Sequence, residues 1–161
     1  MIRARANTSR APDREAVSKD RRAARQLALD ILYQAEIRDQ LPSEALSLRR
    51  EAGWILSSDE ERSVPSEDAI RYATQLVEGV ESDSATIDEL IARVAERWAL
   101  ERMPVVDRNV LRLALYELLA APDVPTAVVI NEAIELVKSL STEESGRFIN
   151  GILGRVAQEV R

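Results

Sequence analysis

The chain has 161 residues and a net charge of −6. This length is enough for one domain with a hydrophobic core but is short for two domains, and the net charge makes the chain acidic. It contains no cysteine and no histidine, which excludes disulfides, thiol catalysis and metal sites made of thiolates or imidazoles. Its apolar stretches are far shorter than the ~20 residues of a membrane span, and the basic N-terminus lacks the apolar segment of a secretory signal. We therefore expect a cytoplasmic protein without membrane contact, metal or cofactor.

The N-terminus is a basic segment on an otherwise acidic chain. Residues 1–25 carry a net charge of +5, so the remaining residues carry −11. We expect residues 1–18, which show no hydrophobic periodicity, to form a disordered arm ahead of a single domain over 19–161. Such an arm is either a solvated tail or a source of salt-dependent attraction to phosphate.

The rest of the chain has the hydrophobic periodicity of an all-α domain, without sustained strand-like alternation. Prolines and polar capping residues mark where helices begin and end. These signals predict about seven helices packed as one domain. The helices are expected over 19–38, 42–54, 66–81 and 84–98, with a polar loop over 57–65, and three more after Pro104, Pro125 and Ser141.

Two of the last three helices have specific start signals. Pro125 lacks an N–H that a first helical residue does not need, and Ser141 has Glu144 three residues later, as in a capping box. The helix over 106–120 is apolar nearly all round, which indicates a place in the core. We expect three of its charged residues to pair with neighbouring helices; these are Arg108, Arg112 and Glu117.

The first helix carries basic and aromatic residues opposite its apolar stripe. At ~100° per residue, Arg22, Arg25 and Tyr33 project away from the stripe of small and aliphatic residues. A tyrosine beside arginines can stack an unpaired nucleobase. A surface tyrosine packed against a loop would give the same pattern, so this arrangement alone is weak.

The last helix repeats this combination around Phe148, the only phenylalanine in the chain. Phe148 lies ~100° from the apolar stripe of its helix, with Arg147 directly before it. Gly151 removes a side chain nearby, which would allow another backbone to approach. Two aromatic and cationic arrangements on one small domain favour RNA as a ligand.

Several of these segments together resemble the NusB family of antitermination factors. The first helix has the family's R-R-x-A-R-x-x-A-x-x-x-L-Y pattern between Arg21 and Tyr33. The C-terminal half has L-R-x-A-L-Y-E-L, D-V-P, I-N-E-A-I-E-L-x-K and, with isoleucine for valine at two places, F-V-N-G-V-L. These motifs lie at 111–118, 123–125, 130–138 and 148–153, and the resemblance covers most of 20–157.

The resemblance implies an all-helical fold of two three-helix bundles and no enzymatic activity. It implies binding of single-stranded boxA RNA together with NusE, a small-subunit ribosomal protein, in an RNA polymerase antitermination complex that reads through terminators in ribosomal RNA operons. A partner-binding acidic face is expected around Glu101 and Asp107, although Asp107 could equally cap the helix that follows it. The family's RNA-contacting positions fall on Arg21, Arg22, Arg25, Tyr33, Arg147 and Phe148.

Two other functions are compatible with parts of this pattern. A NusB-like domain can accompany an RNA cytosine methyltransferase, but this chain has no glycine-rich strand-to-helix turn for S-adenosylmethionine and no cysteine nucleophile. A helical adaptor that binds only proteins is not excluded by the sequence. A boxA RNA-binding measurement, with and without the ribosomal partner, separates that adaptor from an antitermination factor.

Overall fold

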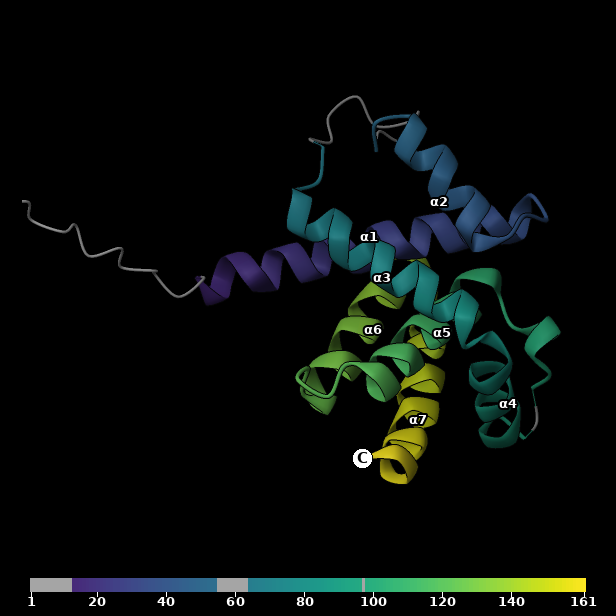
Figure 1. Ribbon diagram of the computed structural model, residues 1–161. Helices are drawn as coiled ribbons and strands as arrows, with labels where there is room; N and C mark the ends of the chain where they lie inside the picture. Colours follow the sequence, from purple (N-terminus) through teal and green to yellow (C-terminus); the bar gives the residue numbers. More distant parts are fainter. Residues whose placement is uncertain (1–12, 55–63, 97) are drawn as a thin grey trace, which may run out of the picture.

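The computed structural model describes residues 13–54, 64–96 and 98–161. These residues form seven α-helices and one short 3-10 helix, so the expected all-α class is confirmed (Figure 1). Residues 1–12 of the predicted arm and 57–63 of the predicted loop lie outside the described residues. The elements are α1 (Arg14–Ile37), α2 (Pro42–Glu51), α3 (Glu67–Ser82), α4 (Ser84–Val94), η1 (Leu100–Arg102), α5 (Val105–Ala120), α6 (Thr126–Leu140) and α7 (Glu143–Val160).

Three helices have a boundary several residues away from the sequence prediction, and one of them, α2, ends at Glu51 rather than near Trp54. Helix α1 begins at Arg14 because the carboxylate of Asp13 caps it, accepting a hydrogen bond from the backbone N–H of Glu15 at 3.1 Å. Residues 14–18, which we assigned to the arm, are therefore helical. Helix α4 ends at Val94 rather than near residue 98, and the chain continues into η1.

The starts of the last two helices differ by one residue from the prediction. Pro125 is the N-cap of α6, and not its first helical residue. Helix α7 is capped by Thr142, whose hydroxyl accepts from the N–H of Ser145 at 3.2 Å. Ser141 lies one residue too early to cap, and its hydroxyl instead contacts that of Ser145 at 3.0 Å. Threonine provides the same capping chemistry as serine, which is why the predicted helix still forms.

The helices form the two three-helix bundles that the family resemblance implies. Helices α1, α2 and α3 pack together as one bundle, and α5, α6 and α7 as the other (Figure 1). Helices α1 and α3 also pack against α5, and α4 packs against α5 and α7. Helix α5 is therefore enclosed by helices from both bundles, as its apolar circumference predicted. Among the helices in the described ranges, none is long and apolar enough to cross a lipid bilayer.

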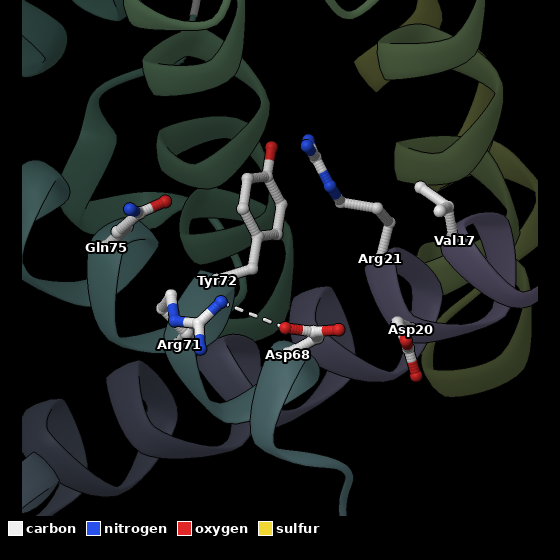
Figure 2. A pocket seen from close by; sticks show the side chains of 7 residues that line it. All are labelled: Val17, Asp20, Arg21, Asp68, Arg71, Tyr72 and Gln75. Atoms are coloured by element: carbon white, nitrogen blue, oxygen red, sulfur yellow. Dashed lines mark hydrogen bonds and ion pairs between the residues drawn. The ribbon is translucent and has the colours of Figure 1, made fainter. Parts of the chain in front are cut away.

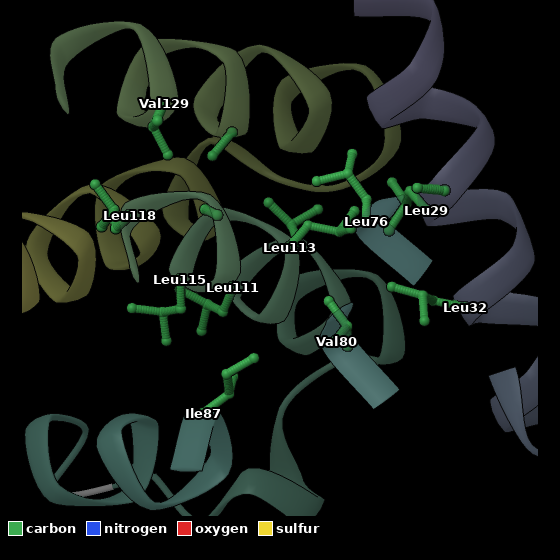
Figure 3. Close-up of a cluster of buried hydrophobic side chains, with 14 of the residues drawn as sticks. Leu29, Leu32, Leu76, Val80, Ile87, Leu111, Leu113, Leu115, Leu118 and Val129 are labelled. Carbon is green, nitrogen blue, oxygen red and sulfur yellow. The ribbon is translucent and has the colours of Figure 1, made fainter. Parts of the chain in front are cut away.

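The core is built around the leucines of α5. Leu111 and Leu115 are completely buried. Figure 3 shows them among side chains that come from the surrounding helices. These neighbours include Leu76 on α3, Ile87 on α4 and Val129 on α6 (Figure 3). The predicted central position of this helix is confirmed.

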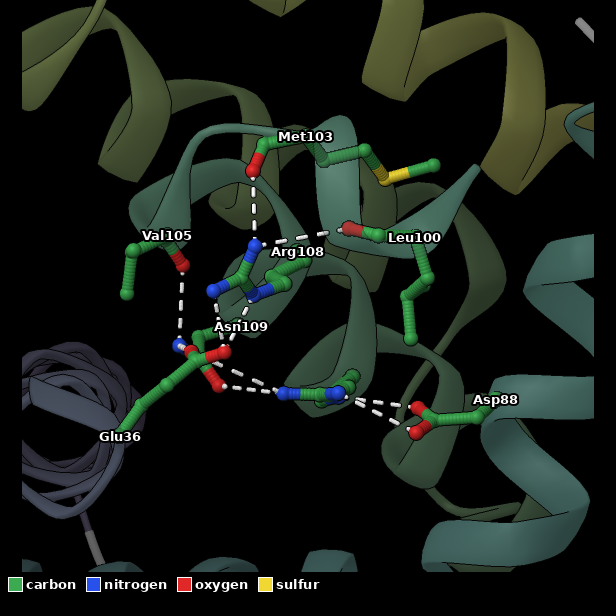
Figure 4. A network of polar contacts seen from close by, with 8 residues as sticks. Glu36, Asp88, Leu100, Met103, Val105, Arg108 and Asn109 are labelled. Atoms are coloured by element: carbon green, nitrogen blue, oxygen red, sulfur yellow. Dashed lines mark hydrogen bonds and ion pairs between the residues drawn. The ribbon is translucent and has the colours of Figure 1, made fainter. Parts of the chain in front are cut away.

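Charged residues of α5 connect the two bundles on one side of the core (Figure 4). Glu36 of α1 accepts hydrogen bonds from Arg108 and, at 2.7 Å, from the side chain of Asn109. Arg112 donates to both carboxylate oxygens of Asp88 on α4, at 2.9 and 3.1 Å. The prediction that Arg108 and Arg112 pair with neighbouring helices is confirmed.

Candidate nucleic-acid interface

Arg22 is an exposed cation on α1 that is partly neutralised by α6. Its side chain is 65% exposed, and its Nε and Nη2 atoms donate to the carboxylate of Glu132 at 3.2 and 2.9 Å. The hydrogen bonds and charge of Glu132 raise the pKa of Arg22, and the hydrogen bonds from Arg22 lower the pKa of Glu132. A phosphate that approaches Arg22 must therefore compete with, or bind beside, a fixed carboxylate.

Tyr33 lies three turns after Arg22 and on nearly the same side of α1, because eleven residues at ~100° each bring the helix back to its starting direction. Its side chain is 43% exposed. The predicted exposure of Tyr33 is thus confirmed. An exposed ring on the side that carries an exposed guanidinium can stack one base of a strand whose phosphate, at another nucleotide, the arginine attracts.

Arg25 does not lie on this surface, and its predicted exposure is wrong. Only 5% of it is exposed, and its Nε and Nη2 atoms donate to the two carboxylate oxygens of Glu117 at 2.6 and 2.8 Å. Burial lowers the pKa of Arg25, but the hydrogen bonds and charge of Glu117 outweigh this, so its pKa lies above the usual value. Helix α5 packs against this side of α1. Helix α1 therefore has a second buried face, which cannot be predicted from the single apolar stripe in its sequence.

Arg21 faces α3 rather than the side that carries Arg22. Its guanidinium carbon lies 3.9 Å from the centroid of the Tyr72 ring, as Figure 2 shows from close by, and its ion pair with the exposed Asp123 is long, at 3.9 Å. The hydroxyl of Tyr72 donates to Glu117 at 2.9 Å. Burial, together with the charge of Glu117 and this hydrogen bond, raises the pKa of Tyr72 to about 12. Sequence reasoning missed Tyr72, since no motif marks it.

Phe148 is half-buried at the start of α7, next to the exposed Arg147. Its ring lies 6.1 Å from that of Trp98, with an angle of 56° between the two planes. Trp98, which precedes η1 and is more than half exposed, was also missed. The two rings line a pocket of about 310 Å³. Its other lining residues are Arg102, Met103, Pro104, Asp107, Thr142, Glu144 and Ser145.

Of the two predicted partner-binding carboxylates, one is exposed and one is not. Glu101 lies exposed on η1. Asp107 is 2% exposed, and its Oδ2 atom accepts from the hydroxyl of Ser145 at 2.6 Å. It therefore neither presents an open acidic face nor caps α5, whose N-cap is Pro104. Its Oδ1 atom is buried and has no hydrogen-bond partner among the described residues.

Residues 22–158 match the model of the NusB family. The chain belongs to the NusB family. The matched region contains α2 to α6 completely and most of α1 and α7, and it begins after residues 1–21. The NusB motifs at both ends of the match lie on the two helices, α1 and α7, that carry the exposed aromatic and cationic residues described above.

Individual NusB proteins agree with this assignment in sequence and in structure. The transcription antitermination protein NusB of Salinispora arenicola is 47% identical over 138 residues, which cover 86% of this chain and 95% of that protein. The NusB protein of Myxococcus xanthus is 47% identical over 137 residues, covering 85% and 94%. A solved structure of NusB from T. maritima superposes with a TM-score of 0.74 at 41% identity, covering 86% of this chain and 91% of that one. NusB in a crystal structure with NusE and double-stranded RNA gives a TM-score of 0.72 at 27% identity, covering 88% and 98%.

Proposed function

We propose that this protein is a transcription antitermination factor that binds single-stranded boxA RNA and acts together with the ribosomal protein NusE. The observation that carries the proposal is the side of α1 on which the exposed guanidinium of Arg22 and the exposed ring of Tyr33 lie three turns apart. A guanidinium attracts the phosphates of a single strand, and an aromatic ring stacks on its unpaired bases. The similar solved complex of NusB and NusE with double-stranded RNA supports RNA and NusE as partners.

The two groups have different roles in the proposed complex. Arg22 supplies a phosphate contact, which contributes salt-dependent affinity for any sequence. Tyr33 stacks on a base, a contact that depends little on salt. Arg147 and Phe148 at the start of α7 form a second contact of the same kind. Arg25 is not a contact residue in this proposal, because Glu117 holds it inside the protein.

We infer that the ribosomal partner docks near η1 and the start of α5. The chain after residue 25 carries a net charge of −11, and a basic protein is attracted to such a body. Glu101 is an exposed carboxylate on η1. Asp107 belongs to the docking site only as a buried acceptor, whose Oδ1 atom has no partner within the described part of the chain.

The test is a titration of fluorescently labelled boxA RNA, with and without NusE, at several salt concentrations. Arg22→Gln should weaken binding and flatten its salt dependence by roughly 0.7 in the logarithmic slope, the value for one lost phosphate contact on a single strand. The control is Arg93→Gln, because Arg93 is a similarly exposed arginine on α4 that pairs with Glu159. A protein that binds NusE but never binds boxA RNA would overturn the proposal and leave the protein-binding adaptor.

A further inference from the structure

A groove lies between α1, α3 and α5 on both sides of the contact between Arg21 and Tyr72. One part, of about 220 Å³, opens toward the charged residues of α1 and α3 (Figure 2). The other part, of about 360 Å³, lies toward α5. Arg21, Tyr72 and Gln75 line both parts, so the two parts adjoin each other at the stacked pair.

The larger part is a slot with aromatic and aliphatic walls. Tyr72 and Tyr116 line it together with Arg21. Leu76, Ala120 and Ala121 add apolar surface, and Gln75 and Asp123 add polar groups. Both polar side chains are on exposed residues, so hydrogen-bonding groups lie within reach of an otherwise apolar slot.

The ring of Tyr72 is held by a hydrogen bond, and the ring of Tyr116 packs closely on α3. The hydroxyl of Tyr72 donates to Glu117, which is itself fixed by Arg25. The ring of Tyr116 occupies the space that a Cβ atom on Gly79 of α3 would need. Because Tyr72 is fixed before any ligand arrives, binding would require little ordering of this side chain.

The charges of the slot favour a planar neutral group over a phosphate. Arg21 is balanced by Asp123, and the adjoining part of the groove adds Arg71 with Asp20 and Asp68. A phosphate would meet these carboxylates. A nucleobase, in contrast, stacks on tyrosine rings and on a guanidinium plane. Its edge could then form hydrogen bonds with an amide or a carboxylate at the opening.

We propose that this slot between Tyr72 and Tyr116 receives one nucleobase of the RNA strand that binds α1. The inference rests on the proposed RNA-binding function and extends it to a surface on α3 and α5. Arg21 and Arg22 are consecutive residues and point ~100° apart around α1. A strand whose phosphate lies at Arg22 can therefore place a neighbouring nucleotide at Arg21, where the slot begins.

The experiment fills the slot and leaves its charges unchanged. Ala120, at the end of α5, lines the slot and is exposed, so Ala120→Trp should occupy the space of the base. The matched control is Ala92→Trp, because Ala92 is also exposed but lies on α4. Ala120→Trp should weaken boxA RNA binding roughly 5- to 150-fold, the equivalent of one lost stacked base, with the salt dependence unchanged. Ala92→Trp should bind as the wild type does.

A scan with abasic nucleotides identifies the base and separates blocking from distortion. At one position of the strand, removing the base should make wild-type and Ala120→Trp proteins bind equally. The proposal is wrong if wild-type and Ala120→Trp proteins bind the intact RNA with equal affinity. It is also wrong if their affinities differ at every abasic position. If the wild-type protein does not bind boxA RNA at all, both the proposed function and the proposed base-binding slot are wrong. Should Ala120→Trp not fold, Gln75→Trp on α3 fills the slot from the opposite wall.

Discussion

Arg25 of α1 and Glu117 of α5 form a buried ion pair with two hydrogen bonds, of 2.6 and 2.8 Å, between residues 92 positions apart in the sequence. Tyr72 of α3 donates to the same carboxylate, so three helices meet at one glutamate. The three arginines of the family's basic motif on α1 therefore have different environments in the folded protein. Arg22 remains at the surface, Arg21 stacks on Tyr72, and Arg25 joins the two bundles.

Removing Glu117 should therefore destabilise the protein strongly. Glu117→Ala leaves a buried guanidinium without its counter-charge, and such a loss costs about 3–5 kcal/mol in the free energy of unfolding. The control is Glu159→Ala, because Glu159 pairs with Arg93 at the surface and exposed pairs contribute about 0–1 kcal/mol. Urea unfolding measures both. Equal losses in the two variants would show that the buried pair is not a structural link.

Replacing all three side chains of this buried cluster by apolar ones tests whether the unpaired charge causes the loss of stability in Glu117→Ala. In the triple variant Arg25→Met, Glu117→Leu and Tyr72→Phe, no charge or hydroxyl is left without a partner. Because apolar replacements of buried pairs are often neutral, this variant should recover most of the stability that Glu117→Ala loses. A triple variant as unstable as Glu117→Ala would mean that shape, rather than charge pairing, fixes these helices.

The sequence predicted the elements whose signals are local. Helix α5 is apolar all round, so its central position followed from its own residues, and Tyr33 is exposed as its place on α1 suggested. The burial of Arg25 could not be predicted in this way, because it depends on a glutamate brought close by the packing of α1 on α5. The same is true of Tyr72 and Trp98, whose neighbours come from other helices. Asp107 was misplaced because its acceptor role depends on Ser145 of α7.

Leu115→Ala should lower the free energy of unfolding by about 2–5 kcal/mol, as for other fully buried leucines. Leu115 is completely buried at the centre of α5, so the truncation leaves a cavity that neighbouring helices cannot fill. Leu119→Ala, four residues along the same helix and 38% exposed, is the matched control and should change stability by less than about 0.5 kcal/mol. Thermal melting of both proteins decides whether α5 is central.

Stability should fall at alkaline pH through the ionisation of Tyr72. Burial, with the charge and hydrogen bonding of Glu117, raises its pKa from 10.0 to about 12, so the folded protein holds the phenolic proton more tightly than the unfolded chain does. This contribution is complete below pH 10 and is lost as the pH rises toward 12. In urea unfolding across this range, Tyr72→Phe should lose less stability than the wild type. Parallel curves for the two proteins would contradict the raised pKa.

Phe148→Ala should weaken RNA binding by about 1–3 kcal/mol, the value of one stacked base, while leaving the salt dependence nearly unchanged. Phe148 also packs on Trp98, so the substitution could destabilise the protein. The melting temperature of the variant must therefore be measured together with its RNA affinity. Tyr33→Ala is the companion variant, because Tyr33 is more exposed and its removal should affect stability less. A well-folded Phe148→Ala protein that binds boxA RNA like the wild type would remove Phe148 from the interface and leave the contact on α1.

Gly79→Ala should destabilise the packing of α3 on α5. A Cβ atom at this position would lie within clash distance of the Tyr116 ring, whereas at Gly154 on α7 it would meet nothing within 4 Å. Overpacking typically costs about 1–3 kcal/mol, although alanine by itself favours a helix by up to about 1 kcal/mol over glycine. Gly154→Ala should therefore be neutral or stabilising, while Gly79→Ala should lower the melting temperature. The same substitution should also weaken binding of boxA RNA at the slot, because the ring of Tyr116 must move to make room for the new methyl group. If the melting temperature and the RNA affinity of Gly79→Ala both equal those of the wild type, the Tyr116 ring is free to move and does not form a rigid side of the slot.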